Sequence, residues 1–386
     1  MPISMIHRRH VGCGAGVATL LVKAALAGSA ASVGPRLVAI VFLVIASLLS
    51  GRAAAASGES VCTSVLAGEF ADAPRNSAAP PRRPELNLAV SGRYCLEEDV
   101  RQEKLLDHRG RELAARGGDA IVLVGADDIH LDLGGHTVAN AREPGYTLVR
   151  HDRHVPGRVQ SHWFAGTVVR NGYLVSPGGA GTAIRLVSAQ RYAPQGFGEP
   201  AALVPGQSLD DVFRRTRHRL EHLTIAAGRR AILIDGRDNV IRHNRIVVDG
   251  YTAIVAQGPG VVIEDNLIEV RGDLSGLSAH ERAADGAHPF VIRLIQADGA
   301  VVRNNRVRLT GGTPPLAAAI ELTASRAVTL EENRLDGFAR AVQADTRSDY
   351  MASANLVRPC WPRGTRLVAP LEGGAGRVSA EQVGCR

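Results

Sequence analysis

The sequence predicts an all-β fold, a single-stranded parallel β-helix (a solenoid) with three short strands in each coil. A phrase of two apolar residues, two variable residues, an asparagine and, after one more residue, another apolar residue recurs along the second half of the 386-residue chain. Most copies are 22 residues apart, and no run between them has the length expected of a helix. Repeats of this length made of short β-type runs are typical of solenoids.

The asparagines of this phrase mark the coils. The intervals between them are 22 residues, with two longer ones of 39 and 28 residues. In order, the repeated positions are His222 (a stand-in), Asn244, Asn266, Asn305, Asn333 and Asn355. We expect the stacked asparagines to form a ladder of amide hydrogen bonds, which is a structural and not a catalytic role. Asparagine also tolerates the left-handed conformation that a sharp bend needs, so we expect Asn244 to adopt it.

One coil shows how its elements follow from the sequence. The runs 240–241, 246–248 and 252–256 are short and rich in β-branched residues. Turn signals separate them at Asn244, at Asp249-Gly250 and at Gly258-Pro259. One such coil cannot bury its inner face alone, so we expect each strand to pair in parallel with its copy in the next coil.

Upstream phrases extend the pattern. They are Gly92-Arg93-Tyr94-Cys95-Leu96 with the acids after it, Leu131 to Val138, and Arg170-Asn171-Gly172. Together they resemble the start of right-handed parallel β-helix repeat proteins, the pectin-lyase-like superfamily, over roughly residues 88–358. The resemblance implies a right-handed coil and a protein that binds polysaccharide or acts on it. It implies no single reaction, because this fold hosts lyases, hydrolases, epimerases and proteins of no known activity.

The N-terminus is typical of a signal peptide over residues 1–56. It has five basic residues and no acid, an apolar run at 37–49, and small residues at 53–57. We expect cleavage near Ala56 and export to the periplasm or the cell exterior, with no stable membrane insertion afterwards; an uncleaved signal anchor is the alternative. The remaining chain divides into an extension (57–90), the β-helix (91–358) and a C-terminal cap (359–386).

Net charge argues against a nucleic-acid partner. The whole chain carries +7, but removal of the five basic signal residues leaves 45 − 5 = 40 Lys and Arg against 38 Asp and Glu. The chain has no basic tail and no series of aromatic residues for stacking bases.

We expect a polysaccharide partner and neither a cofactor nor a metal. A histidine-rich stretch at 151–162 leaves metal binding open as a weaker alternative.

Four cysteines follow the signal, and an even number in an exported chain favours disulfides. Two precede the first coils and two follow the last. Pairing of nearest neighbours joins Cys62 to Cys95 and Cys360 to Cys385, although other connectivities remain open.

The 39-residue interval contains an insertion at 272–289 with two histidines, His280 and His288. Asp285 and His288 weakly resemble part of the Asp-Pro-His-Asp signature of alginate C5-epimerases. Proteins similar in fold often build a carbohydrate cleft from loops at this turn and the strand after it. A second insertion at 189–218 contains a short helix that begins at Ser208, and we expect it to cover part of the stack.

In each coil, one strand follows the turn at which the 272–289 insertion falls. Period-2 alternation gives this strand one central position that points outward. These positions are Arg185, Leu233, Val255, Arg293, Glu321 and Gln343, with Asp235, Gln257 and Gln296 near a second outward position. We expect His280, His288, Arg293 and Glu321 to be catalytic and the polar members Arg185, Asp235, Gln257, Gln296 and Gln343 to bind substrate.

The expected chemistry is proton abstraction beside a uronate carboxylate, as in a lyase or C5-epimerase. A base removes the C5 proton, and an arginine neutralises the carboxylate. A non-catalytic carbohydrate-binding or structural β-helix protein is the alternative, and so is an ordinary solvated sheet face.

Overall fold

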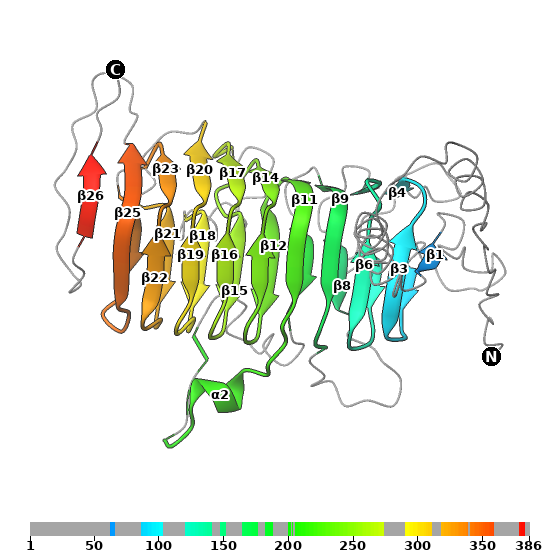
Figure 1. Ribbon diagram of the computed structural model, residues 1–386, viewed down its shortest axis with the longest axis horizontal. Coiled ribbons are helices and arrows are strands. Elements are labelled where there is room, and N and C mark those ends of the chain that lie inside the picture. The colour runs from blue at the N-terminus through cyan, green and yellow to red at the C-terminus, as the bar shows by residue number, and fades with distance from the viewer. Residues whose placement is uncertain are drawn as a thin grey trace, which may run out of the picture. The chain divides into compact units, whose positions relative to one another are not determined.

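The computed structural model confirms the parallel β-helix, and every pairing between its strands is parallel. The residues that the structure describes are 62–65, 86–102, 120–140, 147–151, 164–176, 182–187, 200–201, 203, 205–273, 290–310, 318–338, 340–358 and 378–382. Their strands form two sheets, here called sheet A and sheet B, whose successive strands stand side by side along the stack (Figure 1).

Sheet B contributes one strand to each coil. Its strands are β2 (Leu86–Leu88), β5 (Ala120–Val124), β8 (Thr147–His151), β10 (Thr182–Leu186), β12 (Arg230–Asp235), β15 (Ile254–Gln257), β18 (Ile292–Ile295), β21 (Ile320–Thr323) and β24 (Val342–Ala344).

Sheet A contributes two short strands to most coils, or one long strand that spans both. The first strand of each coil, or the N-terminal part of a long strand, belongs to what is here called the first half of sheet A. The second strand, or the C-terminal part of a long strand, belongs to its second half. Its strands are β1 (Thr63–Val65), β3 (Gly92–Leu96), β4 (Val100–Gln102), β6 (Ile129–Asp132), β7 (Thr137–Asn140), β9 (Val168–Ser176), β11 (Arg219–Ala227), β13 (Val240–Arg242), β14 (Arg245–Val248), β16 (Val262–Glu264), β17 (Leu267–Val270), β19 (Val301–Arg303), β20 (Arg306–Leu309), β22 (Val328–Glu331), β23 (Arg334–Asp336), β25 (Tyr350–Arg358) and β26 (Val378–Gln382).

Alternation along each strand builds the core. In the second half of sheet A, the residue two places after each ladder position points inward and is almost fully buried. This inward row is Ile225, Ile246, Ile268, Val307 and Leu335. Full burial of each such aliphatic side chain contributes roughly 1.5–3 kcal/mol. The aliphatic column therefore stabilises the stack without many aromatic residues, which make up only 4% of the chain.

The asparagine ladder is confirmed. The side-chain amide and the backbone N–H of Asn244 both donate to Oδ1 of Asn266, each at 3.0 Å. Asn266 donates in the same way to Asn305, at 2.9 and 3.1 Å. The ladder continues through Asn333 to Asn355, so the buried polar groups at five successive bends are satisfied.

Two details of the bend differ from the sequence prediction. Leu223, not His222, is the register partner of Asn244, and its N–H donates to the Asn244 side chain at 2.9 Å. The left-handed conformation belongs to the residue before the ladder position, with φ of 57° at His222 and 54° at His243. The ladder asparagine itself has to aim its amide along the stack, so the preceding residue makes the bend.

The N-terminal coil is closed by a disulfide between Cys62 and Cys95, whose Cα atoms are 5.7 Å apart. The strands β1 and β2 join the stack through β3 and β5, so pairing begins before residue 91. The second expected pair, Cys360 with Cys385, lies outside the described residues.

The second insertion contains the expected short helix, α2 (Leu209–Val212), which projects from the stack of strands (Figure 1). Ser208 is its N-cap, and Ser208 and Asp211 form a reciprocal capping box. After the helix, Phe213 is 1% exposed and packs so closely over Gly258 that a Cβ there would lie 2.9 Å from its ring.

Candidate functional site

The outward row of sheet B has the predicted register. Each member pairs with the next across neighbouring strands, in the order Arg185, Leu233, Val255, Arg293, Glu321 and Gln343. The repeat therefore located these positions correctly, and parallel pairing places Arg293 directly beside Glu321.

The prediction that this row faces solvent is wrong for its middle. Leu233 and Val255 are 3% and 2% exposed, and they pack with Val187 and Ile295 in an apolar cluster separate from the core. The cluster is on the outer side of sheet B, so other parts of the chain cover this face.

One described contact shows the cover. The backbone N–H of Ala201 donates to Oε1 of Gln296 at 2.7 Å, and Nε2 of Gln296 donates back to the Ala201 carbonyl at 2.8 Å. Gln296 therefore already holds a backbone segment, and it lies at the bend after β18 (φ 49°), one place beyond Ile295, the register partner of Gln257.

Arg293 and Glu321 are joined by a hydrogen-bonded ion pair. Their side chains are only 10% and 12% exposed. Each charge is neutralised by the other, so in this arrangement the guanidinium is not presented to an incoming carboxylate.

The other predicted substrate-binding side chains differ in their exposure to solvent. Asp235 and Gln257 are buried, Arg185 is half-buried, and Gln343 is exposed. His280 and His288 lie outside the described residues, as does the rest of their insertion from residue 274 on.

Sheet A carries a second polar row, which the sequence analysis did not predict. In its first half, acids and arginines alternate along neighbouring strands, in the order Asp132, Arg170, Glu221, Arg242, Glu264, Arg303 and Glu331. The arginines are paired: Arg170 with Asp132 at 2.9 Å, Arg242 with Glu221 at 2.7 Å, and Arg303 with Glu264 at 2.6 Å. Burial alone would raise the pKa of the Glu221 carboxyl, but Arg242 and Arg219 hold it below its ordinary value.

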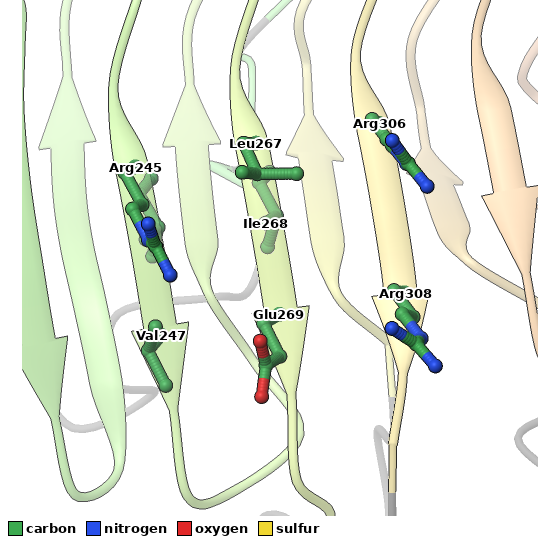
Figure 2. Close-up of a pocket in the computed structure, with 8 residues that line it drawn as sticks. Arg245, Val247, Leu267, Ile268, Glu269, Arg306 and Arg308 are labelled. Atoms are coloured by element: carbon green, nitrogen blue, oxygen red, sulfur yellow. The ribbon is translucent and has the colours of Figure 1, made fainter.

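The second half of sheet A differs. Residues of β14, β17 and β20 line a groove on this sheet, here called the arginine groove (Figure 2). Its lining residues are Arg245, Ile246, Val247, Leu267, Ile268, Glu269, Arg306 and Arg308. Leu267 lies in register between Arg245 and Arg306, and Glu269 lies between Val247 and Arg308.

The three arginines of this groove are exposed, and none of them forms an ion pair with another described residue. Leu267 between them is 42% exposed. On the same sheet, the arginines of the alternating row are neutralised by acids one strand away. The arginine groove is therefore a place where positive charge and an apolar side chain are both available to a ligand.

A simple signal could have identified this groove. Its first row consists of the residues directly after the ladder asparagines, Arg245, Leu267 and Arg306. Alternation sends the residue after each buried asparagine outward, so the same repeat that predicts the core also predicts this surface.

The histidine-rich stretch contributes to the core where it is described. His151 is buried against Phe164 and His218, with ring centroids 5.4 and 5.0 Å away. Burial lowers the pKa of His151 to about 3, although its hydrogen bond to the Val187 backbone acts in the other direction. Burial, and then the nearby His151, also lower the pKa of His218 well below its ordinary value.

His218 and His151 are thus neutral core side chains at neutral pH. In the described residues, no group of three or more His, Cys, Asp or Glu is arranged to hold a metal ion. No helix in the described ranges is both long and apolar enough to cross a bilayer.

Comparison of the chain with protein-family models, with curated proteins and with solved structures found no match.

Proposed function

We propose that this protein is an exported parallel β-helix protein that binds an acidic polysaccharide in the arginine groove of sheet A. The observation that carries the proposal is the group of exposed arginines Arg245, Arg306 and Arg308 around the exposed Leu267, none of which forms an ion pair within the described part of the chain. Guanidinium groups bind carboxylates through paired hydrogen bonds, so a ligand with regularly placed carboxylates fits this surface.

The spacing of the groove favours a sugar polymer. Neighbouring strands lie about 4.8 Å apart, so Arg245 and Arg306, two strands apart, are separated by about 10 Å along the stack. That distance is comparable to the length of a disaccharide unit of an extended chain. Leu267 between them offers an apolar contact for the C–H face of a pyranose ring, which inorganic anions lack.

Three further features support export and carbohydrate binding. The N-terminal 56 residues have the composition of a signal peptide. The disulfide Cys62–Cys95 suits an oxidising compartment. The phrases at Gly92–Leu96 and Leu131–Val138 resemble those of pectin-lyase-like proteins.

Lyase or epimerase chemistry on the same class of glycan is a second candidate function. It is favoured by the placement of Arg293 and Glu321 on neighbouring strands, next in the chain to the insertion with His280 and His288. Catalysis there requires the Arg293–Glu321 pair to open, because both side chains are now engaged. Unsaturated products absorb in the ultraviolet, and NMR of the polymer detects epimerisation, so both reactions can be measured.

The binding proposal is tested by calorimetric titration of the protein with polygalacturonate, alginate and the neutral polymer dextran. We expect binding to the two polyuronates and not to dextran. Removal of either arginine, Arg245→Ala or Arg306→Ala, should weaken binding about tenfold, which is about 1.4 kcal/mol.

Arg326→Ala is the matched control, since Arg326 is an exposed arginine between β21 of sheet B and β22 of sheet A, outside the groove. It removes the same charge and should leave affinity unchanged. Equal binding of dextran, or full affinity after loss of both groove arginines, contradicts the proposal.

A further inference from the structure

The first row of the arginine groove continues beyond the groove toward the N-terminal coils. Arg245 pairs with Thr224 of β11, and Thr224 pairs with Tyr173 of β9. The row is here called the axial strip and consists of Tyr173, Thr224, Arg245, Leu267 and Arg306. All five side chains are on the outer face of sheet A, because their inward neighbours are buried in the core.

The axial strip is unusual in its exposed apolar surface. Five large hydrophobic side chains are exposed in the described part of the chain, and two of them, Tyr173 (47%) and Leu267 (42%), are in this row. Tyr173 and Leu267 have Arg245 between them. Apolar and cationic side chains thus alternate along one line of the surface, with the hydroxyl of Thr224 in between.

The geometry of the strip is set by the solenoid. Its five members belong to five successive parallel strands that pair without a shift in register. Four steps of about 4.8 Å give the strip a length of about 19 Å, and its direction is perpendicular to the strands. A small ligand would cover only part of it, whereas an extended chain can contact the whole row.

We infer that the axial strip is a continuous binding surface for an extended acidic oligosaccharide of at least four sugar residues, which lies parallel to the stack of coils. This inference rests on the proposed function. Carboxylates bind Arg245 and Arg306, and sugar rings pack on Leu267 and on the ring of Tyr173, whose flat face and polar hydroxyl suit a pyranose.

Glu269 and Arg308 lie beside the strip in the second row of the groove and limit what can bind there. Glu269 repels an anion that approaches between the two arginines of the strip, and it can accept hydrogen bonds from sugar hydroxyls. The charge pattern therefore fits a chain with spaced carboxylates and free hydroxyls better than a densely charged polyphosphate.

The test is a calorimetric titration with oligogalacturonates of two to six residues. We expect the association constant to rise with each added residue up to four or five and then to level off. Tyr173→Ala should weaken binding of the pentamer about fivefold and leave that of the dimer unchanged, whereas Tyr173→Phe keeps the ring and should retain nearly full affinity.

Met351→Ala is the control variant, because Met351 is 68% exposed on sheet A but belongs to the other half of the sheet. Its affinity for every oligomer should equal that of the unchanged protein.

The outcomes separate the inference from the proposed function. An affinity that is already maximal for the dimer, or a Tyr173→Ala variant with full affinity for the pentamer, overturns the axial strip while groove binding stands. Absence of binding to every uronate oligomer and polymer overturns both. Tighter binding of single-stranded DNA than of polyuronate also overturns the inference, because the strip would then recognise phosphate.

Discussion

The Arg293 guanidinium hydrogen-bonds the Glu321 carboxylate across two neighbouring strands of sheet B, in a position where both side chains are almost completely buried. The pair lies on the outer side of the sheet, beside the apolar cluster of Leu233 and Val255. Buried ion pairs depend on both partners, because a single charge left behind is costly to keep out of water.

Arg293→Ala is therefore expected to lower the free energy of unfolding by about 3 kcal/mol, because it leaves the Glu321 carboxylate buried without its main partner. The measurement is urea unfolding followed by far-UV circular dichroism. The double variant Arg293→Met with Glu321→Leu removes both charges and should recover much of the loss. An Arg293→Ala variant with an unchanged midpoint would show that the pair is not buried in solution.

The asparagine ladder gives a second prediction. Asn266→Ala removes the oxygen that accepts two hydrogen bonds from Asn244, and it also removes the amide that donates to the Ile241 carbonyl. Unsatisfied buried groups cost about 1–3 kcal/mol each, so we expect a loss of about 3 kcal/mol in unfolding free energy.

Leu267→Ala is the control for that variant, since Leu267 is the next residue in the chain but is exposed. Its unfolding free energy should change by no more than about 0.5 kcal/mol. Equal stabilities of the two variants in urea would rule out the ladder as a source of stability.

Buried histidines predict a pH dependence of stability. The pKa of His151 is about 3 in the folded protein and about 6.5 in the unfolded chain, so the unfolded chain binds an extra proton between these values. The contribution of His151 to stability is complete above pH 6.5 and declines as the pH falls toward 3. Burial gives His218 the same sign.

The effect of the histidines can be separated from that of the carboxylates. Carboxylates with lowered pKa values, such as Glu221 and Asp345, lose their contribution only below about pH 5. The melting temperature should thus already fall between pH 7 and pH 5.5, and His151→Leu should reduce that fall. A His151→Leu protein with an unchanged slope in this range would contradict the assignment.

Salt should weaken the binding of polyuronates to the arginine groove. Exposed charges are screened over about 8–10 Å at moderate ionic strength, so affinity should fall as sodium chloride rises from 50 to about 300 mM. The Arg245→Ala, Arg306→Ala double variant has fewer charges to screen and should show a shallower dependence. A salt dependence identical to that of the unchanged protein would place binding elsewhere.

Much of the fold was predictable because the repeat is a local property. Alternation and the interval between Asn244 and Asn266 assign each residue to a strand, a coil and a face. For this reason the row from Arg185 to Gln343 has the predicted register, and the short helix forms where Ser208 as its N-cap predicts. The exact bend residue was missed, because the left-handed residue lies directly before the ladder asparagine, which also tolerates that conformation.

The sequence by itself determined the stacking of coils, the aliphatic column and the faces to which residues belong, since these depend on neighbours at a regular interval. Exposure on sheet B was decided by tertiary structure, because the cover includes Ala201, which is 95 residues from its partner Gln296. The arginine groove was also decided there. Leu267 and Arg306 are 39 residues apart in the chain, and whether an arginine is free or neutralised depends on which side chain the next strand places beside it.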